Sequence, residues 1–367
     1  MIIKDFVSFN PKRRKPTDYV NYIDTSSVED GKLIDIQRLS DNIPSRAQRV
    51  IEEGDILISS VRPILKHNYY VSQHIENGIA STGFIQIRAD GSKVIPQYLY
   101  YFLTEENKVK MYQTIAETSQ STFPSFNKDV IENMAFPDIS LAEQQHIVDI
   151  LGTLDDKIEN NSKEIEEYEH LLELYFTQML SEKTDEWDEQ SLLDIAEYTN
   201  GLAMQKFRPR GSEYLPVVKI KELSQGRTDN NSEQADIAIG ERFIIDDGDI
   251  IFAWSGTLMV KIWCGGKAGL NQHLFKVTSP KYSKWFIYLW TKYHLIKFQN
   301  IAKGKAVTMG HIKREDLANS VALIPTKDVL KKYESIISPL FDRIVLLHQE
   351  NKTLFSLKSQ YLQQFFG

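Results

Sequence analysis

The 367-residue sequence contains a single cysteine, Cys264. One thiol excludes internal disulfides and any metal site built from several cysteines. No run approaches the roughly 18 consecutive apolar residues that a membrane-spanning helix requires, and the N-terminal Met1–Phe6 lacks the apolar stretch of a secretory signal. We therefore expect a folded cytoplasmic protein with no membrane association. At 42% hydrophobic residues, a chain of this length is too long for one ordinary core, which predicts two or more domains.

Common catalytic motifs are also missing. The sequence has no Gly-x4-Gly-Lys-Ser/Thr phosphate loop, because Gly266-Lys267-Ala268 and Gly304-Lys305-Ala306 both lack the hydroxyl residue. It has no Asn-Pro-Pro-aromatic signature of amino methyltransferases. The eight histidines show no metal-ligand spacing, and no serine lies in a nucleophile elbow. These absences favour a binding protein over a catalyst, although an enzyme with an unfamiliar active site stays open as an alternative.

Charge is distributed unevenly along the chain. The net charge of -7 divides into -2 for residues 1–139, -8 for 140–184, +1 for 185–325 and +2 for 326–367. Within the third segment, residues 251–325 carry eleven Lys or Arg against only Glu315 and Asp316, with several Trp, Phe and Tyr interleaved. Cations mixed with aromatic residues are typical of nucleic-acid-binding surfaces. On charge alone, a solvated surface around an aromatic core is an equally good interpretation.

The chain repeats itself at a spacing of about 190 residues, a sign of internal duplication. The segment 50–59 is similar to the segment 243–252 when Gly54-Asp55 is aligned with Gly248-Asp249. Both Gly-Asp pairs are expected to be structural, with Gly forming a tight turn and Asp capping it. Further matches join 83–87 to 273–277, 98–102 to 286–290, and 115–122 to 301–308.

Each copy is predicted to be a mixed α/β domain followed by a long helix. Runs of β-branched and aromatic residues bounded by Gly, Asn or Asp indicate strands, and the aromatic runs after Pro96 and Lys284 indicate short helices. We therefore predict an α+β fold with a first domain at 1–139, a helix at 140–184, a second domain at 185–325 and a second helix at 326–367. The two similar domains are thus separated by a pair of long helices.

Both helical segments carry an apolar seam with a period of 3.5 residues, which is typical of coiled coils. The first seam comprises Leu151, Leu154, Ile158, Asn161, Ile165, Tyr168, Leu172, Tyr175 and Met179. The second comprises Ile337, Leu340, Ile344, Leu347, Asn351, Leu354, Lys358, Tyr361 and Phe365. The simplest topology is an antiparallel pair within one chain, each seam holding one register-setting asparagine. The alternative is that each helix packs only on its own domain.

Several motifs resemble the specificity subunit of a type I restriction-modification system. The opening of the first helix, Pro137 through Ile158, is similar to that family's Pro-x5-Glu-Gln-x-x-Ile followed by Leu-Asp-x-x-Ile. The segments that look like target-recognition elements are Pro44-Ser45-Arg46, Gly54–Leu57, Ser60–Pro63 and Ser81–Phe84 in the first domain, with Gly248–Gly256 and Asn271-Gln272 in the second. The resemblance covers essentially the whole chain.

This resemblance implies that each globular domain reads one half of a bipartite double-stranded DNA target in the major groove. It also implies that the helix pair sets the unread spacer and binds two methyltransferase subunits, and it leaves open a restriction or translocase subunit. The chain itself would be non-catalytic and bind no cofactor, while partner subunits would supply S-adenosylmethionine, ATP and Mg. A coiled-coil scaffold that binds only proteins is the competing interpretation.

Base reading requires polar side chains on loops, and backbone binding requires flanking cations. In the first domain the candidate DNA-binding residues are Arg46, Arg49, Arg62, Lys66, Ser119, Gln120, Ser121 and Thr122. In the second they are Trp254, Ser255, Lys261, Asn271, Gln272, His273, Lys303, Lys305 and Thr308. For Arg46 and Arg62 an ion pair within the domain is an equal alternative, and for Asn271 and Gln272 it is the capping of a turn.

Overall fold

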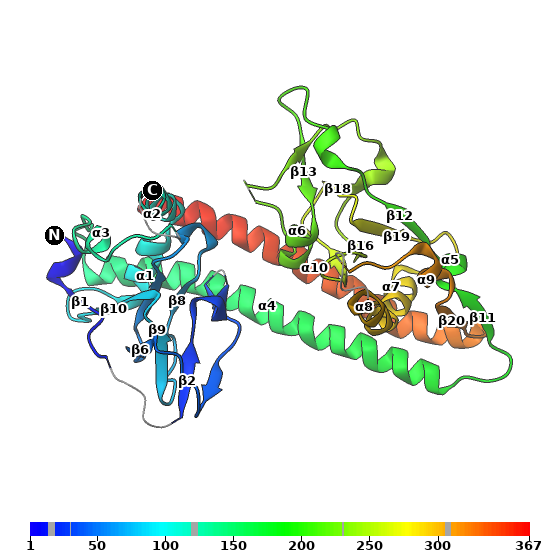
Figure 1. The fold of residues 1–367 in the computed structure, drawn as a ribbon, viewed down its shortest axis with the longest axis horizontal. Helices are drawn as coiled ribbons and strands as arrows, with labels where there is room; N and C mark the ends of the chain where they lie inside the picture. The colour runs from blue at the N-terminus through cyan, green and yellow to red at the C-terminus, as the bar shows by residue number, and fades with distance from the viewer. Residues whose placement is uncertain (14–18, 30, 119–123, 230, 305–309) are drawn as a thin grey trace. The chain divides into compact units, whose positions relative to one another are not determined.

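The computed structural model describes residues 1–13, 19–29, 31–118, 124–229, 231–304 and 310–367 (Figure 1). The chain divides into two compact units. Unit 1 comprises residues 1–156 and 356–367, and unit 2 comprises residues 157–355. Across the described ranges, no helix is both long and apolar enough to cross a membrane.

Unit 1 contains two four-stranded sheets. The first is antiparallel, in the order β1 (Val7–Phe9), β10 (Phe84–Ala89), β7 (Ile56–Ser59), β8 (Asn68–Tyr70). The second has the order β5 (Gln37–Leu39), β2 (Val20–Ile23), β9 (Gly78–Ser81), β6 (Ala47–Val50), in which β2 and β9 are parallel. The remaining elements are β3 (Val28–Glu29), β4 (Lys32–Leu33), α1 (Pro96–Thr104), α2 (Glu106–Glu117), α3 (Asp129–Glu132) and the short 3-10 helices η1 (Ile3–Asp5), η2 (Thr25–Ser27) and η3 (Pro63–Leu65).

Unit 2 has the same two sheets in the same order. The antiparallel sheet is β12 (Glu197–Asn200), β19 (Leu274–Thr278), β16 (Asp249–Ala253), β17 (Met259–Trp263). The second is β14 (Gln234–Ala235), β13 (Leu215–Val218), β18 (Ala268–Leu270), β15 (Ile244–Ile245), in which β13 and β18 are parallel. The other elements are α5 (Leu192–Ile195), α6 (Ile220–Gln225), α7 (Lys284–Tyr293), α8 (Leu295–Lys303), α9 (Arg314–Ala318), the 3-10 helices η4 (Met204–Lys206) and η5 (Glu241–Phe243), and a two-stranded ribbon of β11 (Asp188–Ser191) with β20 (Val321–Ile324).

The strand register confirms the duplication that the sequence predicted. Ile56 pairs with Ile87 in unit 1, and Ile250 pairs with Val277 in unit 2, at the spacing of the sequence match. The structural role of both Gly-Asp pairs is also confirmed. Gly54 and Gly248 have φ angles of 86° and 82°, a region that strongly favours glycine. In each pair the following aspartate, Asp55 or Asp249, accepts a hydrogen bond from the backbone N–H three residues earlier, at 2.8 and 2.9 Å.

The core of unit 1 is aromatic, and it forms where α1 covers the first sheet. Pro96 occupies the first turn of α1, where its missing N–H costs no helical hydrogen bond. The rings of Tyr98 and Phe102 then point into the core, where both contact Phe136. Leu151 of helix α4 (Leu141–Ser181) completes this core.

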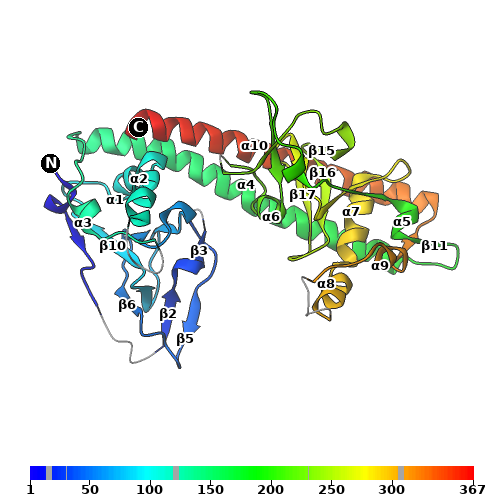
Figure 2. The same ribbon diagram turned by 45° about the horizontal axis from the view of Figure 1, so that its top comes forward.

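Helices α4 and α10 (Lys327–Phe366) run side by side (Figures 1 and 2). Every residue of the first predicted seam is buried or half-buried, as is every residue of the second. In unit 2, Asn161 Nδ2 donates to Asn351 Oδ1 at 2.9 Å, and Arg343 pairs with Glu164 at 3.1 Å. The residue numbers rise along one helix as they fall along the other, which confirms the antiparallel pair.

The helices also pack on the sheet domains, as the alternative interpretation of the seams expected. Packing between the helices and packing on the domains are thus two contacts of the same helices. In unit 2, Phe176 and Met179 of α4 and Phe341 of α10 are buried with the residues of α7. The Phe176 ring meets the Trp290 ring edge-on at 5.1 Å. Each helix therefore buries two faces, one toward its partner helix and one toward a domain.

Candidate nucleic-acid interface

In both units the same backbone clasp holds one end of the antiparallel sheet. In unit 1, Ser60 O accepts from Phe126 N at 3.0 Å, and Arg62 N donates to Pro124 O at 2.9 Å. In unit 2, Trp254 O accepts from Ile312 N at 3.1 Å, and Gly256 N donates to Gly310 O at 2.9 Å. We call these regions the loop ends. The loop end of unit 1 comprises residues 60–62 and 124–126, and that of unit 2 comprises residues 254–256 and 310–312.

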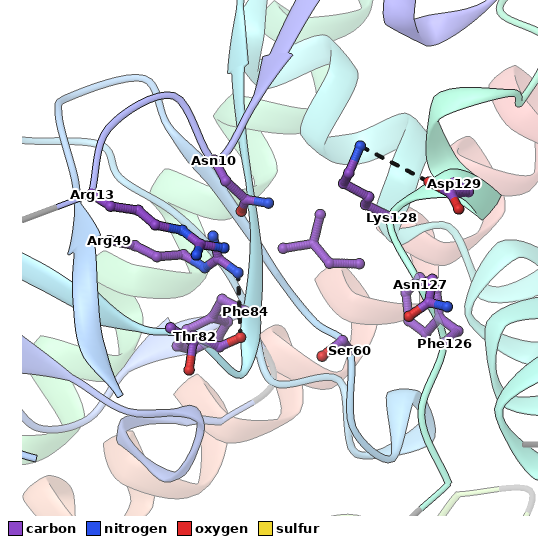
Figure 3. Close-up of a pocket in the computed structure, with 11 residues that line it drawn as sticks. Asn10, Arg13, Arg49, Ser60, Thr82, Phe84, Phe126, Asn127, Lys128 and Asp129 are labelled. Atoms are coloured by element: carbon purple, nitrogen blue, oxygen red, sulfur yellow. Dashed lines mark hydrogen bonds and ion pairs between the residues drawn. The ribbon is translucent and has the colours of Figure 1, made fainter. Parts of the chain in front are cut away.

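The loop end of unit 1 contains a cavity of about 380 Å³. Its walls come from segments distant in sequence, namely Asn10, Arg13, Arg49, Ser60, Thr82, Phe84, Ile85 and 126–129 (Figure 3). Arg13 and Arg49 lie together on one wall, and Lys128 and Asp129 lie on the other. The clasp brings these segments together by holding 124–126 against 60–62.

Arg49 is the candidate that the structure places inside this cavity. It is held on β6, and its side chain is buried, with Nη2 donating to Thr82 O at 3.4 Å. Burial and the neighbouring positive charge of Arg13 lower the pKa of the Arg49 guanidinium to about 10. The guanidinium remains a cation at neutral pH, but burial and the nearby charge make its charged form less stable than it would be in water.

The other candidates of unit 1 lie in different environments. Arg46 forms an ion pair with Asp24, the arrangement left open by the sequence. Arg62 and Lys66 flank η3 with φ angles of 48° and 52°, and η3 is fixed to α2 by a hydrogen bond from Ile64 N to Gln113 Oε1 at 3.2 Å. The candidates Ser119, Gln120, Ser121 and Thr122 lie outside the described residues.

Unit 2 brings five of its candidates together at its loop end, as a cluster of Trp254, Ser255, Asn271, Gln272 and His273. Ser255 Oγ lies 2.9 Å from His273 Nδ1, and Gln272 Nε2 lies 3.3 Å from His273 Nε2. Trp254 Nε1 donates to Asn200 Oδ1 at 3.0 Å, and the Trp254 ring stacks on Phe275 at 5.6 Å between centroids. These contacts orient His273 and Trp254 from both sides.

Asn271 has the geometry of a turn cap. It is buried, and its Oδ1 accepts from His273 N at 3.4 Å, while its backbone O accepts from Leu274 N at 3.0 Å. Its neighbours Gln272 and His273 are only half-buried. Within this cluster, Asn271 is thus placed to shape the turn, and the two following side chains remain partly exposed.

The lysine candidates of unit 2 that the structure describes are exposed. Lys261 is exposed on the edge strand β17, and Lys303 is exposed at the end of α8. Lys303 lines an open cavity of about 590 Å³ together with Gly256–Leu258, Gln299 and Gly310. Lys305 and Thr308 lie outside the described residues.

The positive excess of residues 251–325 is partly neutralised by carboxylates from outside that segment. Lys276 pairs with Asp249 at 2.8 Å, and Lys292 pairs with Glu173 of α4 at 2.9 Å. Lys284 Nζ donates to Gly248 O at 2.8 Å and lies 3.9 Å from Asp249. A count along the sequence therefore overstates the free positive charge of this surface.

Sequence reasoning missed the other polar residues of the unit 1 cavity, which include Asn10, Arg13 and Lys128. A signal for Arg13 was present, since Lys12 through Lys15 are four consecutive basic residues. Within the described residues, no group of three or more His, Cys, Asp or Glu side chains is arranged to hold a metal ion. Cys264 is buried, and burial raises the pKa of its thiol to about 12.

Comparison with known proteins assigns the chain to a family. The family model described as the type I restriction modification DNA specificity domain matches residues 3–170 and 184–355. The chain belongs to this family. It carries two copies of the domain, one for each sheet unit, and is a specificity subunit with two target recognition domains. Specificity subunits are the non-catalytic members of their complexes.

Two curated relatives and one solved structure illustrate the likeness. The chain is 26% identical to the type I restriction enzyme MjaIX specificity subunit of Methanocaldococcus jannaschii, over 90% of this chain and 80% of that protein. It is 30% identical to the HindI specificity subunit of Haemophilus influenzae, over 43% of this chain but only 34% of that protein. The crystal structure of the type I S subunit from M. genitalium aligns with 100% of this chain and 95% of its own, with a TM-score of 0.56 and 13% identity. At that identity the likeness shows the fold alone.

Proposed function

We propose that each unit of this chain reads one half of a bipartite double-stranded DNA target in the major groove through its loop end. This proposal rests on one observation. The two units share the same scaffold, but the polar side chains at their loop ends differ. The clasp and strand order repeat, yet unit 1 presents an arginine-lined cavity where unit 2 presents Trp254, Gln272 and His273. Two readers of different half-sites need a common frame with different polar groups at the reading end.

The chemistry at each loop end suits different parts of DNA. Arginine guanidinium groups bind phosphates and guanine edges with paired N–H donors, and glutamine amides pair with adenine edges. His273 and Gln272 are half-buried and held by neighbours, so little side-chain entropy would be lost on binding. Lys303 and Lys261, which are exposed outside the cluster, would contact the phosphate backbone.

We further propose that the helix pair sets the length of the unread spacer and docks two methyltransferase subunits, with a restriction or translocase subunit as a further partner. S-adenosylmethionine, ATP and Mg would be bound by those partners, and no cofactor by this chain. The complex would act in the cytoplasm, where the DNA is. The family membership of both matched segments supports this assignment.

The deciding experiment is co-expression of the chain with the methyltransferase encoded beside it, followed by mapping of methylated adenines across the host DNA. We expect one asymmetric motif with a fixed internal gap. Exchange of unit 1 residues 1–139 for those of a relative should then change one half of the motif and leave the other half intact. A scaffold that binds only proteins would yield no such motif, and a motif without a gap would contradict two separate readers.

A further inference from the structure

Arg49 of unit 1 is a buried cation whose hydrogen bonds are largely unmade. Its side chain is 6% exposed, and neither Nε nor Nη1 has a hydrogen-bond partner. The single bond from Nη2 to Thr82 O is long, at 3.4 Å. Buried polar groups are nearly always paired, and a buried charge is costly without a counterion. A folded chain that keeps such a group has an unfilled position for an acceptor.

The surroundings of Arg49 increase this deficit. Arg13 and Arg49 face each other in an isolated antiparallel β-bridge. Both side chains are positively charged, so Arg13 repels Arg49 and helps to lower its pKa. Within the described part of the chain, neither arginine is in an ion pair with a carboxylate. Asp129, on the far wall of the cavity, lies 3.9 Å from Lys128 Nζ, and Lys128 also pairs with Glu132.

Unit 2 has no arginine at the position that corresponds to Arg49. Val50 pairs with Ile79 in unit 1 as Ile244 pairs with Gly269 in unit 2, so the position of Arg49 corresponds to Phe243. At this position of the repeat, unit 2 has an apolar ring, carried by η5 (Glu241–Phe243), so the repeat does not call for a cation there. The arginine is therefore explained by a ligand better than by the scaffold.

We infer that the Arg13–Arg49 cavity binds a phosphate of the DNA backbone, and so anchors unit 1 beside the bases that its loop end reads. This inference rests on the proposed function, since it takes the ligand to be DNA. A phosphodiester oxygen would accept from the free Nε of Arg49, on the guanidinium edge that also carries Nη2, and the free Nη1 would donate to a second acceptor. The negative charge of the phosphate would also remove the repulsion between the two arginines. Ser60 and Asn10 line the same cavity and supply further polar contacts.

The test compares the Arg49→Met and Arg13→Met variants of the full chain, purified with its methyltransferase subunits, with the parent protein. Duplex DNA binding is measured by fluorescence anisotropy over a series of salt concentrations. We expect Arg49→Met to weaken binding about tenfold or more, and to reduce the slope of log K against log salt by about 0.9 for the lost phosphate contact. Lys93→Met removes an exposed charge that lies 3.9 Å from Asp90 and donates to Asp5 O at 3.5 Å, and serves as the matched control with unchanged binding.

Thermal stability separates a binding role from a structural one. Because Arg49 is an uncompensated buried charge, Arg49→Met should keep or raise the unfolding temperature of unit 1 while binding is lost. A fall in the unfolding temperature together with the loss of binding would overturn the inference. Arg49→Lys, which keeps the charge but loses the guanidinium's fixed donors, should recover part of the binding without restoring the affinity of the parent.

The remaining outcomes distinguish the inference from the proposed function. Unchanged DNA binding by Arg49→Met, with normal binding by the parent, overturns the phosphate site and leaves the proposed function intact. A parent complex that binds no duplex DNA contradicts the proposed function itself. Inorganic phosphate provides the last arm: if it stabilises the parent but not Arg49→Met, while DNA affinity is equal in both, the cavity binds free phosphate and the assignment to DNA is wrong.

Discussion

At the scale of single residues, the two equivalent turns of the repeat differ in how completely their aspartates are paired. Asp55 is fully buried and accepts hydrogen bonds from Gln86 Nε2 at 2.7 Å and from both Nε and Nη2 of Arg88 at 2.7 and 2.8 Å. Asp249 pairs with Lys276 near the surface and retains 15% side-chain exposure. A satisfied buried carboxylate holds its neighbours in place more strongly than a partly hydrated one does.

We therefore predict that Asp55→Ala destabilises unit 1 by about 3 kcal/mol, because Arg88 and Gln86 lose a shared buried acceptor. Asp249→Ala should cost unit 2 about 1 kcal/mol. All five tryptophans, from Trp187 to Trp290, belong to unit 2, so tryptophan fluorescence follows that unit during urea unfolding. Hydrogen exchange of the β7 and β10 amides follows unit 1. Equal costs at the two positions would contradict the argument from burial.

His294 gives unit 2 a pH dependence. Its ring is buried and stacked near Trp290, and its Nε2 lies 2.8 Å from Val321 O. Burial lowers the pKa of this imidazole, and Lys297 lowers it further, while the bond to the Val321 carbonyl opposes both. The folded pKa thus lies below the ordinary value of about 6.5. As pH falls through that value the unfolded chain binds more protons than the folded one, so stability decreases.

The prediction is a falling unfolding temperature of unit 2 between about pH 7 and pH 5, which the His294→Gln variant should weaken. The transition is followed by tryptophan fluorescence at several pH values. His348 of α10 also has a pKa lowered by burial, so part of the dependence remains in the variant. The exposed His170 of α4 provides the control, and an effect of His170→Gln as large as that of His294→Gln would remove His294 as the cause.

At the scale of the elements, the two asparagines within the seams determine how α4 and α10 align. Asn161 Nδ2 donates to both Asn351 Oδ1 and Glu350 Oε2, at 2.9 and 3.0 Å. Asn161→Leu should lower the stability of unit 2 by about 1–3 kcal/mol, because it removes the donor to the buried Asn351 Oδ1. The double variant with Asn351→Leu should recover most of this loss. A double-mutant cycle in urea measures the coupling, and additive losses would show that the asparagines act independently.

The sequence predicted the helices better than the loop ends, for a physical reason. A seam with period 3.5 recurs over many turns, so a single polar residue within it does not obscure the pattern, and the two seams together predicted the helix pair. Phe176 and Phe341 lie off the seam because they pack on a domain, which a single periodicity does not describe. The cavity of unit 1 joins Arg13, Arg49 and Lys128 from three distant segments, and no local pattern connects them.

At the scale of the whole molecule, the two ends of the chain both belong to unit 1. Phe366 of α10 is 8% exposed, and its ring meets Tyr98 at 5.2 Å and Phe102 at 5.9 Å. Lys108 Nζ donates to Phe366 O at 2.9 Å. The last turns of α10 thus complete a core that residues 1–156 begin, although unit 2 separates these segments in sequence.

The consequence is that a change at the end of α10 should act on unit 1 and spare unit 2. Phe366→Ala is expected to cost unit 1 about 3–4 kcal/mol, and Phe355→Ala, at a position 38% exposed, less than about 1 kcal/mol. Hydrogen exchange of α1 amides should report the loss, while tryptophan fluorescence of unit 2 should show an unchanged transition. In the methylation assay, Phe366→Ala should then relax the half of the motif that exchange of residues 1–139 alters. Relaxation of the other half would contradict the assignment of α10's last turns to unit 1.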